Sequence, residues 1–395
     1  MIKKEAIIRG LKSFDYLLAL TVIAVSAFGV AMIYTATNHV GMPFGPQRAF
    51  GGLWRLQRMH VISGSVLMLV FAAIDYRFIT KLYLFIYGFM MVLLLAAMLV
   101  GADDGTGTAR WLAIPVPGVG SLSLQPSEFA KIFMALSLAK FLDLKKDSFN
   151  RVLWLGLIMV AIAVPVLLVF RQPSLSAALV ILFISLVILF TAGLKFRYIL
   201  IGTLIVVPLL LMLWFDLQRE EALFLYRIFE RYQVVRIRTA LYPIPGSPEF
   251  WQIEQSQRAI AMGGLRGRGF MNNEIYLALA HNDLIFSVVA EQFGFAGGAA
   301  LIGAIMLMVV KCILIALRAI DLQGRLIAAG VAGMLIFETF VHVGVVTGLV
   351  PTTGMPFPFL SYGGSMIWVH MVAMGIVLNI GLARDKDELE EEQIY

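Results

Sequence analysis

Long apolar stretches separated by short polar connections run along almost the whole chain. A helix that crosses a bilayer needs about 20 mostly apolar residues. By this measure the candidate spans centre near residues 25, 66, 91, 133, 161, 183, 205, 300, 337 and 372. A polar segment from about 215 to 282 separates the seventh candidate from the eighth, and a charged tail from about 384 to 395 ends the chain. We expect this tail to be frayed.

This pattern predicts the all-α class: a polytopic membrane helical bundle of about ten transmembrane helices. The large loop between helices 7 and 8 would lie outside the cytoplasm. Residues 1–395 are expected to form a single domain, because a polytopic bundle of this size needs no second core. The basic N-terminus precedes an apolar run without a small-residue cleavage site, so we interpret that run as a retained helix.

Composition supports an integral membrane protein and argues against a soluble one. Hydrophobic residues make up 60% of the chain and charged residues 14%, with a mean hydropathy of +0.87. Soluble domains carry about 25% charged residues. The net charge of +6 is therefore interpreted as a topology signal, not as a nucleic-acid surface. Cys312 is the single cysteine, so no disulfide can form within the chain.

The lysines indicate the orientation in the membrane. If the N-terminus is cytoplasmic, ten lysines fall on the cytoplasmic side and none lies in an outer loop; Lys131 lies within the fourth span. The ten are Lys3, Lys4, Lys12, Lys81, Lys140, Lys145, Lys146, Lys195, Lys311 and Lys386. The positive-inside rule therefore predicts that both termini are cytoplasmic and that the loop at 215–282 is extracytoplasmic.

That loop is rich in arginine and glycine. Its arginines are Arg219, Arg227, Arg231, Arg236, Arg238, Arg258, Arg266 and Arg268. The stretch GGLRGRG (263–269) could bring backbone N–H groups and forked guanidinium donors to a phosphate. It lacks the GK[ST] ending of a P-loop. Because ATP is absent outside the membrane, the anion would be a phospholipid or a lipid-linked pyrophosphate. A flexible turn with solvated arginines is the competing interpretation.

Charged residues inside the predicted spans form the next candidate group. Glu128 and Lys131 in QPSEFAK (125–131) are three residues apart and share a helix face, with Ser123 or Ser127 as a candidate helix cap. Intramembrane charges are costly and often functional, but this pair could also be an architectural ion pair. Four further polar groups, for which hydrogen bonds between helices are the plainer interpretation, are Glu291, Glu338, His342 and His370.

Asp283 stands where the polar loop meets the eighth apolar span, in HNDLIF (281–286). A carboxylate there could cap the helix, as Asp often does. On the residues alone the cap is the plainer interpretation, but the same carboxylate could also act as a general base at the outer surface. From its composition we expect the uncharged, proline-rich stretch 348–365 between the last two spans to line a groove on that same surface. The five histidines show no metal-ligand spacing.

Several of these motifs occur together, in order, in one known family. They are ARW (109–111), QPSEFAK, YQVVRI (232–237), QIEQSQRAIAMGGLRGRGF (252–270), HNDLIFSVVAEQFGFAGG (281–298) and GLVPTTGMPFPFLSYGG (348–364). Together they resemble the SEDS family of polytopic membrane proteins, of which RodA and FtsW are the best-known types. The resemblance covers nearly the whole chain.

The resemblance implies a peptidoglycan glycosyltransferase that polymerises lipid II at the outer face of the bacterial cytoplasmic membrane, in cell elongation or division. Asp283 would be the base that activates the acceptor sugar's 4-hydroxyl, with inversion at the donor. The positions implied in substrate binding are Glu128, Lys131, Arg110, Arg236, Gln255, Ser256, Arg266 and Arg268. A class B penicillin-binding protein would be the partner. A divalent cation, Mg²⁺ or Mn²⁺, is allowed but not demanded, with Glu254 as one possible ligand.

The chain departs from the family pattern at several positions. Ser174 replaces a usual Asp, Ala278 and Leu279 replace Pro-Glu, Asn282 replaces Thr, and His342 replaces Asn. Two other functions remain open on the residues. A flippase for lipid-linked precursors would use the same arginines without needing a base, and a scaffold would only recruit a partner. Asp283 favours the enzyme over the flippase, and the costly intramembrane charges disfavour the scaffold.

Overall fold

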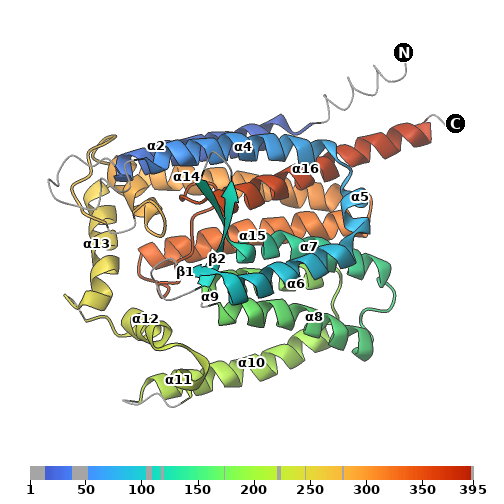
Figure 1. Cartoon of the computed structure of the whole chain (residues 1–395), viewed down its shortest axis with the longest axis horizontal. Helices are drawn as coiled ribbons and strands as arrows, with labels where there is room; N and C mark the ends of the chain where they lie inside the picture. The colour runs from blue at the N-terminus through green and yellow to red at the C-terminus, as the bar shows by residue number, and fades with distance from the viewer. Residues whose placement is uncertain are drawn as a thin grey trace.

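The computed structural model describes residues 14–37, 52–103, 109–116, 120–172, 174–219, 224–244, 246–277 and 280–392. Long helices run side by side along one direction and form a bundle (Figure 1). Both ends of the described chain lie at one end of this bundle, and α12 and α13 lie at the other. The two ends of the bundle therefore differ in what they can bind.

A long helix occurs at each of the ten predicted positions. These helices are α2 (Tyr16–Thr37), α4 (Leu53–Ala73), α6 (Tyr83–Val100), α7 (Pro126–Leu144), α8 (Val152–Arg171), α9 (Leu175–Thr191), α10 (Phe196–Leu217), α14 (Ile285–Arg318), α15 (Leu322–Val346) and α16 (Gly364–Glu392). Among the described residues, eight of them are long and apolar enough to span a bilayer. The other two are α9, with 17 residues, and α7, which contains Glu128 and Lys131. The protein is thus a multi-pass membrane protein, and ten crossings stay a prediction.

The helices divide into a buried centre and a lipid-facing periphery. Within their membrane-length windows, 78% of α16 and 72% of α15 is buried, compared with none of α10. A helix that is apolar all round is stable only inside a protein or in contact with lipid. The exposed apolar surface of α10 therefore requires lipid around it, whereas α15 and α16 form the core against α7, α9, α4 and α14.

A small antiparallel sheet lies between α6 and α7 and was not predicted by the all-α interpretation. Its strands are β1 (Ala102–Asp103), β2 (Ala109–Val116) and β3 (Gly120–Leu124), in the order β1-β2-β3. Leu112 pairs with Leu124, and Val116 pairs with Gly120. Such short strands escaped notice because they lie between long apolar runs. The sheet carries Arg110 and leads directly into α7.

The start of α7 differs in detail from the expectation. Pro126 occupies its first turn, as predicted, but the N-cap residue is Gln125 and no side chain caps the helix. Ser123 and Ser127 therefore do not act as caps. The backbone N–H of Gln125 instead donates to Ser365 Oγ at 3.0 Å, which ties the beginning of α7 to α16.

The long loop between α10 and α14 contains three helices among its described residues. It contains α11 (Leu225–Ile228), α12 (Arg231–Leu241) and α13 (Pro248–Gly263). A reciprocal capping box of Glu230 and Gln233 starts α12, and the Ser247 hydroxyl accepts from the Phe250 N–H at the start of α13. Because α13 contacts α14 and lies across the end of the bundle, this loop covers that end (Figure 1).

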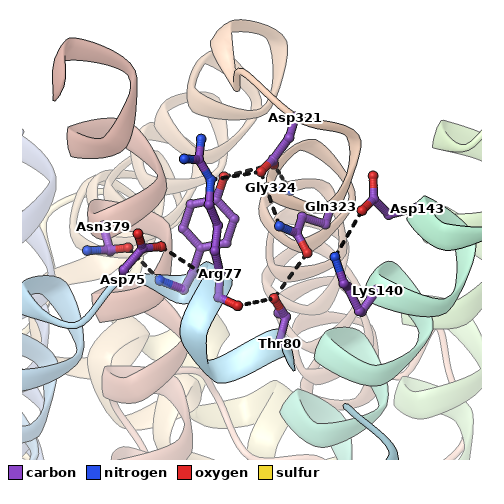
Figure 2. Close-up of polar contacts among 10 residues, drawn as sticks. Asp75, Arg77, Thr80, Lys140, Asp143, Asp321, Gln323, Gly324 and Asn379 are labelled. Atoms are coloured by element: carbon purple, nitrogen blue, oxygen red, sulfur yellow. Dashed lines mark hydrogen bonds and ion pairs between the residues drawn. The ribbon is translucent and has the colours of Figure 1, made fainter. Parts of the chain in front are cut away.

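The opposite end of the bundle is joined by a polar network around Asp321, which caps α15 (Figure 2). The Tyr76 hydroxyl donates to Asp321 at 2.7 Å and Arg77 Nε donates at 3.1 Å. Both donors belong to the short helix α5 (Tyr76–Lys81). Asn379 of α16 accepts from the Tyr76 N–H at 2.9 Å. Three elements far apart in sequence are thereby fastened together.

The tail that was expected to be frayed continues α16 as far as Glu392. Glu, Lys, Arg and Leu are strong helix formers, and the tail consists largely of them. The helix extends past the rest of the bundle in Figure 1. The boundary at about residue 384 is thus a change in composition, with no break in the helix.

Candidate functional site

Asp283 lies in a turn that is fastened to the start of α16. The N–H of Tyr362 donates to His281 O at 2.8 Å, and the Ser361 hydroxyl donates to Asn282 O at 2.7 Å. The N-cap of α14 is Leu284, and no side chain caps this helix. The interpretation of Asp283 as a helix cap is therefore wrong. Two backbone attachments hold the residue in place while its carboxylate remains uncommitted.

The Asp283 carboxylate faces positive charge without being neutralised by a direct bond. It is half-buried, and no described residue hydrogen-bonds to it. Burial raises the pKa of the Asp283 carboxyl, and the positive charges of Arg236 and Arg110 oppose that rise. Gly354 approaches so closely that a Cβ there would lie 3.6 Å from Asp283 Oδ2. The residue types at this point are those of a general base beside an anion site.

Two buried polar atoms next to Asp283 also lack partners. Asn282 Oδ1 and Thr353 Oγ1 are buried without a hydrogen bond to any described residue. Buried polar groups in native proteins are nearly always paired, so exceptions need an explanation. A bound substrate rich in hydroxyls would satisfy both atoms. Asn282, one of the departures from the family pattern, therefore lies at the site itself.

A cavity of about 660 Å³ lies beside Arg236, at the end of the bundle that α12 and α13 cover. Its lining comes from α12, α13 and the stretch 348–365, namely Glu230, Arg231, Tyr232, Val235, Arg236, Thr239, Gln252 and Thr352. The Arg236 guanidinium lies 5.4 Å from the centre of the Tyr232 ring. Arg236 thus belongs both to the cavity and to the surroundings of Asp283. Thr352 agrees with the expectation that 348–365 lines a groove.

The glycine-rich loop has a structural role that was not foreseen. Helix α14 is interrupted at Gly294, whose φ is 65°. The N–H groups of Arg268 and Gly269 donate to Glu291 O and Gln292 O at 3.0 and 2.9 Å. In return Phe295 N–H donates to Gly264 O at 2.8 Å. These N–H groups are therefore used to complete the broken helix and do not form an open cradle for phosphate.

The other predicted residues of this loop lie in different environments. Arg266 is exposed, whereas Arg268 is ion-paired with Glu274. The Ser256 hydroxyl is fully buried and bonds to Ser287 Oγ at 2.7 Å and Val346 O at 2.8 Å, so it fastens α13 to α14 and α15. Gln255 is half-buried on α13. Of these four, Arg266 is the one best exposed to meet a ligand.

Glu128 and Lys131 belong to a closed network inside the bundle. Lys131 Nζ lies 2.8 Å from both Glu128 and Glu338, and His370 Nε2 lies 2.6 Å from the second oxygen of Glu338. Their exposures are 5% for Glu128, 1% for Lys131 and 0% for Glu338. The network thus joins α7, α15 and α16. In this structure it does not line the cavity beside Arg236.

His342 of α15 connects the interior of the bundle to the stretch 348–365. Its Nδ1 lies 2.8 Å from Met355 O, one residue after Gly354. Ser174, a second departure, begins α9 and is buried, whereas Ala278 and Leu279 lie outside the described residues. The expected bonds between helices are therefore present for Glu338 and His370, whereas His342 bonds to the stretch between α15 and α16. His342 acts on the loop that contacts Asp283.

The described residues include no preformed cluster of ligands for the possible divalent cation. Glu254 is paired with Arg258 at 2.7 Å. Among the described residues, no three His, Cys, Asp or Glu side chains are placed to hold a metal ion. The possible involvement of a divalent cation stays a prediction.

Comparison with known proteins places these features in a family. The chain matches the profile of the cell cycle proteins FtsW, RodA and SpoVE over residues 15–386. It is 32% identical over 379 residues to the probable peptidoglycan glycosyltransferase FtsW of Trichlorobacter lovleyi, covering 94% of this chain and 93% of the relative. It is also 32% identical to the peptidoglycan glycosyltransferase MrdB of Escherichia coli K12, covering 93% of each chain.

Solved structures agree with the fold. A structure described as "Structural coordination of polymerization and crosslinking by a peptidoglycan synthase complex" superposes with a TM-score of 0.76 and 28% identity, covering 94% of this chain and 98% of the other. The rod shape determining protein RodA of Thermus thermophilus superposes with a TM-score of 0.66 and 27% identity, covering 94% and 97%.

Proposed function

The chain belongs to the SEDS family of cell cycle proteins, and on this premise we propose that it is a peptidoglycan glycosyltransferase that polymerises lipid II. The observation that carries the catalytic assignment is the half-buried, unbonded carboxylate of Asp283 beside Arg236 and Arg110. Its relatives FtsW and MrdB are named as peptidoglycan glycosyltransferases. The active site proposed here is the cavity next to Arg236 together with the Asp283 turn.

In this proposal Asp283 removes the proton from the acceptor sugar's 4-hydroxyl. The freed oxygen attacks the anomeric carbon of the lipid-linked donor, the bond from that carbon to the pyrophosphate oxygen breaks, and the configuration inverts. The proton stays on Asp283 until it passes to water, and the electron pair leaves with the lipid pyrophosphate. The raised pKa of Asp283 suits this role, because a stronger base accepts the proton more readily.

The arginines supply charge where the leaving group develops it. Arg236 lines the cavity and acts on Asp283, so a pyrophosphate in this cavity would lie near both. A guanidinium binds phosphate oxygens through paired donors. Arg110 would act from the strand side, and the exposed Arg266 would meet the ligand at the outer surface. The remaining predicted residues would support the site without contacting the leaving group; they are Arg268, Gln255, Ser256, Glu128 and Lys131.

The decisive experiment compares Asp283→Asn with the wild-type protein on labelled lipid II, with the protein purified together with its transpeptidase. We expect polymer to fall by at least about 10²-fold, because Asn keeps the shape but cannot accept the proton. Asp143→Asn is the control: it removes a carboxylate that is paired with Lys140 and has no proposed role in the reaction. This control should retain most of the activity.

Equal polymer from wild type and Asp283→Asn, with both variants folded, would show that another group is the base. If no protein makes polymer but labelled lipid II crosses a liposome bilayer, the flippase becomes the better assignment. Both results contradict the proposal in different ways.

A peptidoglycan synthase complex among the similar structures supports a cross-linking partner, and we propose a class B penicillin-binding protein. We also propose that both termini are cytoplasmic.

A further inference from the structure

Five basic residues gather at the end of the bundle opposite Asp283. They lie in the connections α7–α8 and α9–α10 or in the first turns that follow, and are called the basic patch: Lys145, Lys146, Arg151, Lys195 and Arg197. All are exposed except Lys145, which is half-buried. Orientation in the membrane explains why such residues lie on this side. It does not explain their arrangement.

Asn150 fastens the two connections to each other. Its side-chain amide donates to Gly193 O at 3.1 Å and its Oδ1 accepts from the Lys195 N–H at 3.0 Å. Its backbone oxygen accepts from the Tyr198 hydroxyl at 2.8 Å. Arg151 follows Asn150 directly. The α7–α8 and α9–α10 connections are thereby joined into one surface, on which the spacing of the cations is defined.

The charges of the basic patch are left uncompensated, unlike those nearby. In the cluster of Figure 2, Arg77 is paired with Asp321 at 3.1 Å and Lys140 with Asp143 at 3.2 Å. No described residue forms an ion pair with any member of the basic patch. Asp147 is the acidic residue within the α7–α8 connection, so the patch retains a net positive charge. Such a surface attracts an anion.

The surroundings of the patch match a lipid better than a soluble anion. Lys145 Nζ lies 4.1 Å from the centre of the Trp154 ring, and Arg197 stacks on Tyr198 at 4.6 Å. Trp and Tyr are enriched at the level of lipid headgroups. Directly beside the cations, Val152 and Phe196 are 77% and 76% exposed. They begin the apolar outer surfaces of α8 and α10, along which acyl chains can lie.

Two helix N-termini add to the attraction. Arg151 and Lys195 are the N-cap residues of α8 and α10, and neither helix has a side-chain cap. The positive ends of both helices therefore face the same surface as the five cations. The phosphate of an anionic phospholipid placed there would contact the cations and the free N–H groups. Its acyl chains would contact the apolar surface beside them.

We propose that the basic patch, held together by Asn150, is a binding site for an anionic phospholipid. The phosphate contacts the cations of both connections, and the acyl chains follow the outer surfaces of α8 and α10. This inference goes beyond the proposed transferase reaction and does not depend on it, because the two connections that carry the patch lie at the opposite end of the bundle from α12 and α13. Basic sites between helices on one membrane face are suited to such headgroups.

The test uses the full chain in phosphatidylcholine nanodiscs doped with phosphatidylglycerol, followed by native mass spectrometry to count the lipids that stay bound. Lys145→Gln with Lys195→Gln removes two charges from the patch. Arg318→Gln with Arg325→Gln is the matched control, since it removes two exposed charges from the same end of the bundle, outside the patch. Each basic residue at a membrane surface contributes roughly a fivefold gain in binding. We expect the patch variant to retain phosphatidylglycerol roughly 25-fold more weakly.

Asn150→Ala tests whether the arrangement of the cations matters, and not only their total charge. It keeps all five cations but removes the amide bonds to Gly193 and Lys195. We expect lower retention of phosphatidylglycerol at an unchanged melting temperature. Equal retention in the wild type and the patch variant would overturn the proposal, as would an equal loss in the arginine control. Release of the lipid by inorganic phosphate alone would likewise reduce the site to an anion site.

Discussion

The carboxyl of Asp283 is subject to two opposing influences on its pKa. Burial raises the pKa, and the charges of Arg236 and Arg110 lower it, with burial prevailing. A general base must be ionised before it can accept a proton. Activity should therefore be lost at low pH and rise as the pH passes the pKa of Asp283, which lies above the ordinary Asp value.

Replacing Arg236 by Gln removes one of the charges that lower this pKa. We expect the rising limb of the pH–rate profile for polymer formation to move to higher pH, because the ionised carboxylate has lost a stabilising charge. Arg266→Gln is the control, since Arg266 is not among the charges that act on Asp283. A limb that stays in place while KM increases would assign Arg236 to substrate binding alone.

At the scale of elements, the broken helix α14 and the glycine-rich loop form one unit. Gly294 interrupts α14, and the loop supplies the hydrogen bonds that the break leaves open. A Cβ at Gly267 would collide with the backbone at Gln292, whereas Gly269 has open space around it. Both residues have positive φ, 79° and 101°. Substitutions at these two glycines therefore distinguish the effect of a steric collision from the effect of backbone strain.

We expect Gly267→Ala to lower the melting temperature and the polymerase activity clearly more than Gly269→Ala. The Gly269 variant should lose about 1–3 kcal/mol at most from its positive φ. Gly267→Ala adds a collision that must push the loop away from α14. The measurements are thermal unfolding in detergent and polymer yield. Equal effects of both substitutions would mean that the close approach of loop and helix matters little.

The ionic network that joins α7, α15 and α16 yields a prediction about stability. Lys131→Met leaves Glu128 and Glu338 buried without their shared cation. Breaking a buried ion pair by removing one partner typically costs about 3–5 kcal/mol. Lys140→Met, in the same helix, removes a partly exposed partner of Asp143 and should cost less than about 1 kcal/mol. Similar melting temperatures for both variants would contradict the structural importance of the network.

For the whole molecule, the two ends of the bundle should be accessible from opposite sides of the membrane. Gly246 lies between α12 and α13, whereas Lys146 lies between α7 and α8. A membrane-impermeant maleimide added to intact spheroplasts should label Gly246→Cys and spare Lys146→Cys. Cys312 is buried, so background labelling should be low. Reversed labelling would invert the proposed topology.

The membrane class, the positions of the long helices and the family could all be predicted from the sequence, because hydrophobic length and ordered motifs are local properties. The sequence also singled out Asp283 and Arg236 as candidates. The small sheet at 102–124 escaped it, since short strands carry a weak signal beside long apolar runs.

Which polar groups contact one another depends on how the helices pack. Lys131 bonds to Glu338, 207 residues away, and Ser361 bonds to Asn282, 79 residues away. The same is true of Asn150 and the α9–α10 connection. The choice between cap and free carboxylate for Asp283, and between anion cradle and helix repair for the glycines, depended on backbone geometry. Pattern and spacing along one chain do not contain these distances, because they arise only when helices distant in sequence pack together.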